Sequence, residues 1–179
     1  MNQQIRYERL TIGQTPDDLL DTFDRFQQVK RCWQKHDGSW VLKQAEFTED
    51  WDLDKRRDMA RELRHCLQNG GAVYCARGQQ GVVGYAALTG QFFGTRWRYL
   101  QLLTLQVSYG FRRFGIGRRL FGLVAEEAST RGAQKLYISA HPSEESQAFY
   151  LSLGCTDAQQ VNAEIAEAEP YDRQMEFVL

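Results

Sequence analysis

Residues 99–130 constrain the fold of this 179-residue chain more than any other segment. They open with a Leu- and Val-rich run, Tyr99–Ser108, which is typical of a buried strand. A turn containing Gly115 and Gly117 follows. From Gly115 to Thr130 apolar residues recur every three or four positions, which predicts an amphipathic helix. A strand, a glycine turn and a helix in this order indicate a sheet covered by helices.

The rest of the chain predicts a mixed α/β sheet of about seven strands covered by about four helices. Further strands are predicted over Ile5–Ile12, Ala72–Ala76, Val82–Leu88, Lys135–Ala140, Cys155–Val161 and Asp172–Leu179. Helices are predicted after the N-cap Thr15, over Asp52–Leu67 and over Ser143–Leu153. No element is assigned to the irregular segment Gln27–Trp51 or to the acidic stretch Asn162–Glu169. The length favours one domain spanning residues 1–179.

Composition excludes several classes of protein. No stretch approaches the roughly 18 apolar residues of a membrane helix, and the first residues lack the apolar run of a secretory signal. The four cysteines are scattered without a Cys-x-x-Cys pair, which disfavours a disulfide framework or a zinc site. We therefore expect a cytoplasmic protein without a metal and without a membrane partner.

The charge is distributed unevenly although the net charge is only −1. Residues 63–125 carry eight arginines and no acidic residue, whereas residues 126–179 carry a net charge of −7. A basic central block favours an anionic ligand, and the alternative is a strand-rich core segment with exposed arginines. The near-neutral total argues against a nucleic-acid partner.

The glycine turn is the expected anion site. Backbone N–H groups at a helix N-terminus are unpaired, and glycines let a phosphate approach them closely. A P-loop would need Lys-Ser/Thr after Gly117, where Arg118 and Arg119 stand, and a dinucleotide fingerprint would need a third glycine where Leu120 stands. An Arg/Gln-x-x-Gly-x-Gly/Ala coenzyme A loop fits Arg112–Gly117 without adjustment.

The surrounding residues resemble the GNAT acyltransferase superfamily. Val107–Gly117 resembles its strand, turn and helix, and Ala140–Gly154 resembles its second signature. The hairpin with Gly84-Tyr85 and the closing strand with Met175-Glu176-Phe177 match its usual order. The resemblance covers roughly residues 70–179 and implies a GNAT-like fold. It assigns residues 71–179 to an acetyl-CoA-binding core and residues 1–70 to the acceptor side.

The resemblance also implies where the cosubstrate acetyl-CoA would bind. The pantetheine arm would run along the strand before the turn, and the pyrophosphate would rest on the turn itself. The implied cofactor-binding residues are Leu105, Gln106, Val107, Arg112, Arg113, Phe114, Gly115, Ile116, Gly117, Arg118 and Ser143. Arg113 stands where the family often has glycine, and Ser143 where it often has asparagine.

Tyr150 matches the family's usual general acid, which would protonate the departing thiolate. The central strands carry no Asp or Glu, so the amine proton must leave through water, His141 or an N-terminal acid such as Glu46, Glu49 or Asp50. His141 is accordingly a possible base, and the alternative is a surface histidine.

The resemblance implies that the protein transfers an acetyl group directly from acetyl-CoA to a primary amine of an unidentified small molecule or peptide. One alternative is a catalytically silent CoA-binding regulatory module on the same fold. A nucleic-acid binder that uses the central arginines is a third hypothesis. The resemblance also allows a homodimer.

Overall fold

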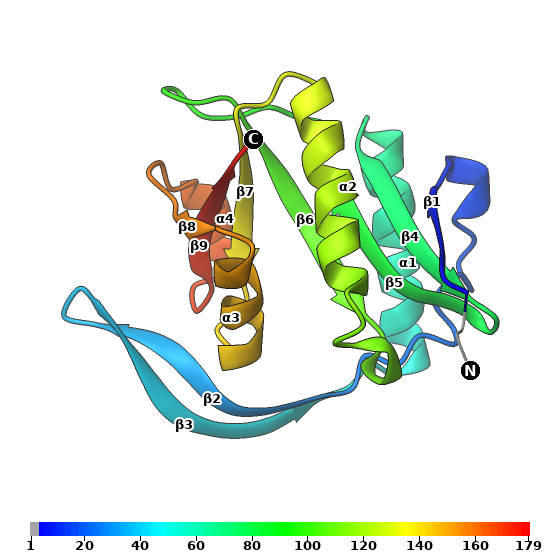
Figure 1. Cartoon of the computed structure of the whole chain (residues 1–179), viewed down its shortest axis with the longest axis horizontal. Coiled ribbons are helices and arrows are strands. Elements are labelled where there is room, and N and C mark those ends of the chain that lie inside the picture. Colours follow the sequence, from blue (N-terminus) through cyan, green and yellow to red (C-terminus); the bar gives the residue numbers. More distant parts are fainter. Residues whose placement is uncertain (1–3) are drawn as a thin grey trace.

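A computed structural model describes residues 4–179 of the protein (Figure 1). Its main sheet has seven strands: β1 (Arg6–Arg9), β4 (Ala72–Gly78), β5 (Gly81–Leu88), β6 (Tyr99–Val107), β7 (Lys135–Ala140), β8 (Thr156–Asp157) and β9 (Arg173–Val178). A separate hairpin pairs β2 (Gln27–His36) with β3 (Ser39–Glu49). The helices are α1 (Leu53–Gln68), α2 (Ile116–Thr130), α3 (Glu144–Ser152) and α4 (Ala163–Ala168). The predicted mixed α/β architecture is confirmed.

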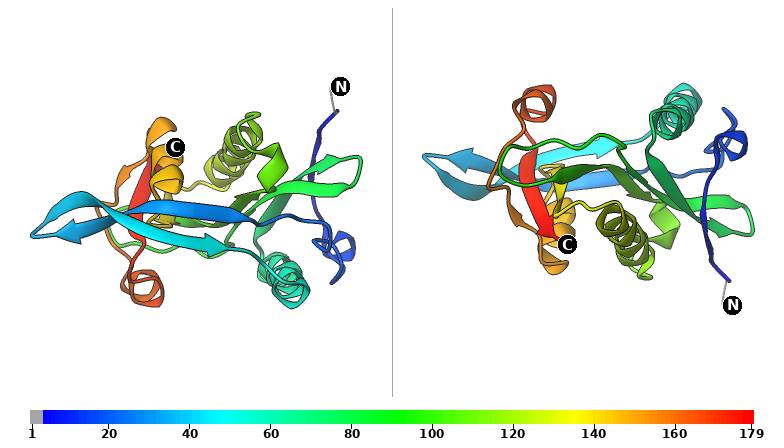
Figure 2. Two further views of the ribbon diagram at one scale, coloured as in Figure 1. Left: turned by 90° about the horizontal axis from the view of Figure 1, so that it is seen from below. Right: turned by 90° about the horizontal axis from the view of Figure 1, so that it is seen from above.

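The strand order in the main sheet is β1-β4-β5-β6-β7-β9-β8. Neighbouring strands are antiparallel, with the exception that β6 and β7 are parallel. Helices α2 and α3 cover one face of the sheet, and α1 and α4 lie on the other (Figure 2). A Cβ atom at Gly84 would lie 2.9 Å from Cγ2 of Ile116, so the glycine allows α2 to pack directly on β5.

The predicted helix after Thr15 is wrong. The chain forms a 3-10 turn over Ile12–Gln14 and further turns up to residue 22. Two acidic residues of this segment bind arginines of α1: Asp21 pairs with Arg57 at 2.9 Å, and Asp17 pairs with Arg64 at 2.7 Å. These ion pairs hold the segment against α1 in a non-helical conformation.

The segment Gln27–Trp51, which appeared irregular, is mostly the β2–β3 hairpin. Its two-residue turn is Asp37-Gly38, and both residues have positive φ, 49° and 81°. That geometry is typical of Asp-Gly hairpin turns. A register shift between Val29 and Arg31 interrupts the regular alternation of apolar residues. The bulge explains why periodicity alone missed the strands.

The C-terminal part also differs from the prediction. The predicted strand Cys155–Val161 shrinks to the two residues of β8, and the acidic stretch after it contains α4. The side chain of Asn162 caps α4 by accepting a hydrogen bond from the N–H of Ile165 at 3.2 Å. Within residues 4–179, no helix is long and apolar enough to cross a membrane.

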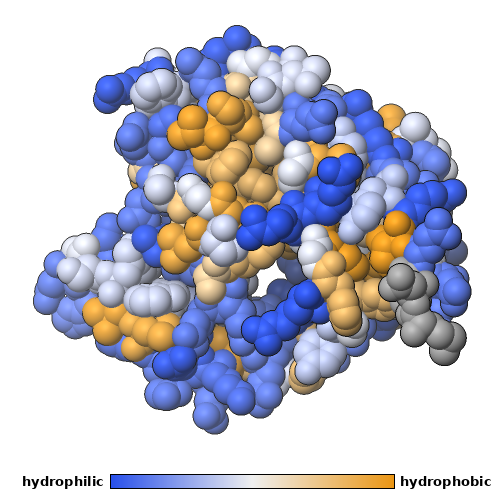
Figure 3. Space-filling model, viewed as in Figure 1, coloured by the Kyte–Doolittle hydropathy of each residue, from blue (hydrophilic) through white to orange (hydrophobic). Residues whose placement is uncertain are grey.

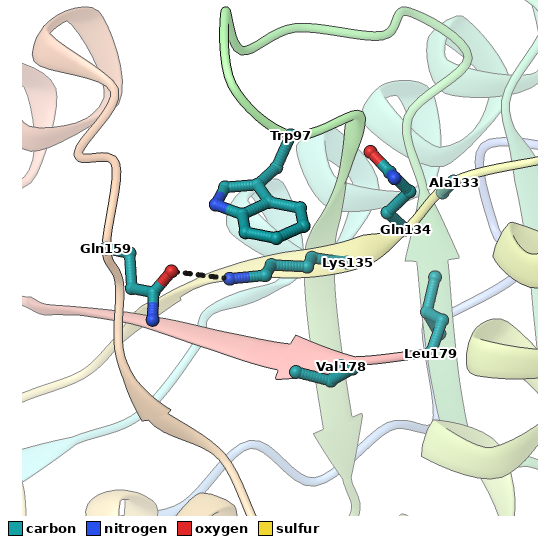
Figure 4. Close-up of a pocket in the computed structure, with 7 residues that line it drawn as sticks. All are labelled: Trp97, Ala133, Gln134, Lys135, Gln159, Val178 and Leu179. Carbon is teal, nitrogen blue, oxygen red and sulfur yellow. Dashed lines mark hydrogen bonds between the residues drawn. The ribbon is translucent and has the colours of Figure 1, made fainter.

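A buried ion pair holds the end of the sheet where β7 begins. Nζ of Lys135 lies 2.6 Å from Oε1 of Glu176 on β9. It also donates to Oε1 of Gln159 at 3.1 Å (Figure 4). The Tyr99 hydroxyl and the N–H of Gln159 donate to Oε2 of Glu176 at 2.5 and 3.0 Å. The Trp97 ring covers the ammonium at 4.3 Å, beside a cavity of about 530 Å³. These contacts fix β6, β7 and β9 together at this end.

We expect Glu176→Gln to lower the free energy of unfolding by about 3–5 kcal/mol at pH 7, because it leaves the Lys135 charge buried without its partner. Burial alone would raise the pKa of Glu176, but hydrogen bonds from Lys135, Tyr99 and Gln159 outweigh it and hold the pKa below its usual range. The ionised carboxylate therefore stabilises the fold above the unfolded pKa of about 4.3, and this stability is lost as the pH falls through the folded value.

Urea unfolding at pH 7 and pH 3 measures both effects. The variant should lose less stability than the wild type on acidification, and adding Lys135→Met should restore part of the loss at pH 7. Wild-type stability of Glu176→Gln at pH 7 would contradict this role of the pair.

Candidate active site

The two parallel central strands separate at the end of the sheet opposite the buried ion pair. β6 pairs with β7 only from Tyr99 opposite Lys135 to Leu102 opposite Ile138. Its other edge stays paired with β5 as far as Val107. The β7-facing edge of β6 therefore has no ladder partner from residue 103 to residue 107. Figure 3 shows an opening in the molecular surface in this region, above the β2–β3 hairpin.

The predicted residues Leu105, Gln106 and Val107 lie on this unpaired part of β6. A strand edge without a partner presents N–H and C=O groups that can bind an extended ligand. The separated strands thus provide a slot with a hydrogen-bonding wall. The slot leads directly to the glycine turn, because β6 ends at Val107 and α2 begins at Ile116.

The turn exposes the N-terminus of α2. Gly115 is the N-cap residue with φ of 80°, and no side chain caps the helix. The first N–H groups of α2 therefore have no side-chain acceptor and can bind an anion. Arg113 also has positive φ, 69°, which explains why glycine is common at this position in the family that the sequence resembles.

The arginines of the turn already have protein contacts. Nε of Arg112 donates to the Val107 carbonyl at 3.0 Å, and its guanidinium packs over the Tyr109 ring at 5.5 Å. Burial lowers the pKa of Arg112, with the neighbouring Arg25 charge adding to the effect. Arg118 donates to the Ser152 carbonyl on α3 at 3.3 Å. Arg112 therefore holds the end of β6, and Arg118 connects α2 to α3.

Gly117 allows α2 to approach α3 and β6. An added Cβ atom would lie 3.3 Å from the Phe149 ring and 3.6 Å from Cγ2 of Val107. Phe114, by contrast, is 77% exposed at the tip of the turn. The turn therefore combines a closely packed glycine with exposed residues in front of the helix N-terminus.

Tyr150 of α3 lies beside this region and is buried. Its ring packs against Phe149 at 5.1 Å and Phe121 at 6.4 Å. Burial, followed by Cys155 and Asp172, raises the pKa of the Tyr150 phenol above its usual value. Within residues 4–179 the hydroxyl makes no hydrogen bond. The phenol is thus a protonated group with an uncommitted O–H.

Two of the predicted residues are occupied by structural contacts. Nδ1 of His141 accepts the N–H of Ser143 at 3.2 Å, and Nε2 lies 3.2 Å from Oε1 of Glu49. This pattern assigns the ring proton to Nε2 and leaves no free lone pair. The Ser143 hydroxyl is fully buried, caps α3 and accepts from Gln27 at 3.2 Å. His141 is therefore oriented towards Glu49, and Ser143 acts as a helix cap.

The hairpin brings Glu49 into the site. Oε2 of Glu49 pairs with Arg25 at 3.1 Å, and the carboxylate is about one third exposed. The N–H of Trp33 donates to the Pro142 carbonyl at 2.8 Å, and Arg31 binds Glu144 through two hydrogen bonds of 2.9 and 2.7 Å. The hairpin is thereby fixed against the start of α3. Of the three N-terminal acids considered from the sequence, Glu49 is the one that contacts His141.

Sequence reasoning missed one carboxylate. Asp172 precedes β9, accepts a hydrogen bond from the Ser139 hydroxyl at 3.1 Å and influences the pKa of Tyr150. The sequence predicts that Asp172 begins the closing strand, and no motif marks it as a functional residue. In the described part of the chain, no group of three or more His, Cys, Asp or Glu side chains could hold a metal ion.

We expect Gly115→Ala to lower the free energy of unfolding by about 1–2 kcal/mol, the usual cost of a left-handed conformation in a residue with a Cβ atom. Gly110→Ala is the matched control, since Gly110 lies in the same loop, has similar open space and has no positive φ. Urea unfolding of both variants measures the difference. Equal stabilities would mean that the turn relaxes without cost.

Comparisons with known proteins agree with this geometry. The family model described as the Acetyltransferase (GNAT) family matches residues 26–155. A search of curated proteins gave no match. The fold is similar to that of nourseothricin acetyltransferase, with a TM-score of 0.68, 17% identity and coverage of 96% of this chain and 95% of the other.

Two further solved structures share the fold. A protein of Bacillus anthracis str. Ames assigned as a streptothricin acetyltransferase, in complex with acetyl coenzyme A, has a TM-score of 0.69 and 11% identity, with coverage of 98% and 99%. Aminoglycoside N-acetyltransferase AAC(6')-Iy in complex with CoA has a TM-score of 0.59 and 14% identity, with coverage of 90% and 94%. At these identities the structures establish the fold alone, whereas the family model spans more than two thirds of the sequence. The chain therefore belongs to the GNAT family of acetyltransferases.

Proposed function

We propose that the protein transfers an acetyl group from acetyl-CoA directly to a primary amine, with the thioester held between β6 and β7. The observation that carries the proposal is the slot itself, formed where β6 leaves β7 after Leu102 and ends at the uncapped helix N-terminus. An acyl-CoA has a matching shape, with an extended amide-containing arm joined to a pyrophosphate. The acetyl-CoA and CoA complexes of two structures with this fold support the choice of ligand.

In this proposal the arm runs along Leu105–Val107 and forms sheet-like hydrogen bonds with the free edge of β6. A backbone N–H of this strand would stabilise the oxyanion formed when the amine attacks. The N–H groups at Gly115–Arg118 bind the pyrophosphate, and Arg113 adds positive charge. Arg112 keeps the end of β6 in place through the Val107 carbonyl.

Tyr150 is the proposed general acid. Its burial favours the protonated phenol, and a protonated hydroxyl without an intramolecular partner can donate to the departing thiolate. This group distinguishes an enzyme from a silent CoA-binding module on the same scaffold. A module that only bound CoA would have no need of a free phenol at that place.

The acceptor is proposed to be a cationic amine that approaches from the hairpin side, where residues 1–70 contribute. Glu49 is a partly exposed carboxylate at that side, and Phe47 lies 6.5 Å from the His141 ring. A carboxylate beside aromatic rings suits an ammonium group. The names of the structures with this fold suggest a first panel of acceptors: nourseothricin, an aminoglycoside and a peptide with N-terminal alanine.

Acetyl-CoA should stabilise the fold. At about 100 times its dissociation constant a ligand adds roughly 2.7 kcal/mol, which thermal unfolding detects. Gly117→Val should abolish the shift, because the added side chain would displace Phe149 and Val107 at the point where α2 approaches α3 and β6. Gly122→Val is the control on the same helix, where no atom lies within 4 Å of an added Cβ. No shift for the wild type at millimolar acetyl-CoA would exclude this ligand.

Tyr150→Phe should separate binding from chemistry. The change removes one oxygen and keeps the ring packed, so acetyl-CoA affinity should stay unchanged while turnover falls by about 10² to 10⁴. Thiol release with the best acceptor of the panel gives the rate, and calorimetric titration gives the affinity. Wild-type turnover in this variant would reduce Tyr150 to a packing residue.

A further inference from the structure

Asp172 ends a chain of hydrogen bonds that runs between β7 and β9. The N–H of Asn162 donates to the Tyr137 oxygen at 3.0 Å, and the Tyr137 hydroxyl donates to Oε1 of Gln174 at 2.7 Å. Nε2 of Gln174 donates to Oγ of Ser139 at 3.0 Å, and the Ser139 hydroxyl donates to Oδ2 of Asp172 at 3.1 Å. A backbone N–H can only donate and an ionised carboxylate can only accept. Every donor therefore points towards Asp172, and the chain stabilises and orients its carboxylate.

The surroundings of Asp172 keep this carboxylate basic. Burial raises the pKa of Asp172; the Ser139 hydrogen bond and His141 oppose the rise, and the charges of Glu169 and Glu49 add to it. No lysine or arginine of residues 4–179 forms an ion pair with Asp172. The net result is a pKa above the usual aspartate value, which brings the group closer to a useful base.

Glu49, the other carboxylate of the site, is less suited to accept a proton. Both of its oxygens are engaged, Oε1 with His141 and Oε2 with the Arg25 guanidinium. A guanidinium partner favours the charged carboxylate and weakens it as a base. Oδ1 of Asp172, by contrast, has no hydrogen-bond partner within the described residues. Asp172 is therefore the better proton acceptor of the two acids.

We infer that Asp172 is the catalytic base that takes a proton from the acceptor's ammonium group. The inference rests on the acetyltransferase function proposed above. The ammonium gives one proton to Asp172, and the freed lone pair attacks the thioester carbon to form the C–N bond. The C–S bond then breaks, and the thiolate receives a proton from Tyr150. The second proton of the attacking nitrogen replaces that phenolic proton, so the products are an amide, CoA and one proton released from Asp172 to solvent.

The groups that face Asp172 support this placement. Glu169 comes from the end of α4, Glu49 from the hairpin, His141 from the end of β7 and Tyr150 from α3. Asp172 contributes to the raised pKa of Tyr150, so the proposed base and the proposed acid lie within electrostatic range of each other. Arg173, the residue after Asp172, pairs with Ala140, which lies beyond the last residue of β7 that pairs with β6. Asp172 is therefore level with the end of β7 at which the two central strands have separated.

The test compares the pH dependence of kcat/KM for four variants, Asp172→Asn, Ser139→Ala, Asp157→Asn and Glu49→Gln, with the best acceptor of the panel. Asp172→Asn should lower kcat/KM at least 100-fold and leave acetyl-CoA affinity and thermal stability unchanged. Ser139→Ala removes the hydrogen bond that favours the ionised form, so the pKa of Asp172 rises and the acidic limb moves to higher pH. Asp157→Asn is the matched control, because Asp157 pairs with Arg173 beside Asp172 and is 59% exposed. It should behave as wild type.

The possible outcomes distinguish a failure of the inference from a failure of the proposed function. Wild-type activity and an unchanged pH profile in Asp172→Asn would overturn the role of Asp172 and leave the acetyltransferase function standing. Loss of the acidic limb in Glu49→Gln, with the limb kept in Asp172→Asn, would assign the base to Glu49. A wild-type protein that binds acetyl-CoA and acetylates no acceptor would overturn the catalytic function and the base assignment together.

Discussion

The separation of two parallel strands is the constraint on which the rest of the site depends. β6 and β7 pair over four residues, from Tyr99 to Leu102, and then part. The buried Lys135–Glu176 pair and its aromatic neighbours hold the strands together at one end. At the other end the gap remains because each strand has a different partner: β5 continues beside β6, and β9 continues beside β7. A slot can therefore form without breaking the sheet.

The parts of the fold with strong local signals could be predicted from the sequence. The strand, glycine turn and helix over residues 99–130 carry their own periodicity, and Asp52 and Ser143 are regular helix caps. The segment after Thr15 was not predictable in the same way, since its acidic residues bind arginines of α1, far along the chain. The hairpin had one local signal, the Asp37-Gly38 turn. The bulge near Val29 interrupts the apolar alternation by which the flanking strands would be recognised.

The same distinction between local signals and long-range contacts applies to the residues of the site. The residues of the turn and Tyr150 follow local motifs, so they can be named as candidates from the sequence alone. Glu49 and Asp172 have no motif and lie 123 positions apart; only the tertiary structure brings both near His141. The Asp172 carboxylate is also defined by its hydrogen-bond chain, whose members come from β7, β9 and the start of α4. Contacts between residues that lie far apart in the sequence produce no periodic pattern from which they could be predicted.

Hydrogen exchange of backbone amides, with and without acetyl-CoA, tests most directly whether the slot is the binding site. The account predicts that the ligand slows exchange at the β7-facing N–H groups of Leu105–Val107 and at Gly115–Arg118, because these free N–H groups gain acceptors. The amides around Trp97 and Lys135, at the opposite end of β7, should exchange as before. Protection confined to that opposite end, or a bound ligand that leaves residues 105–118 unchanged, would contradict the account.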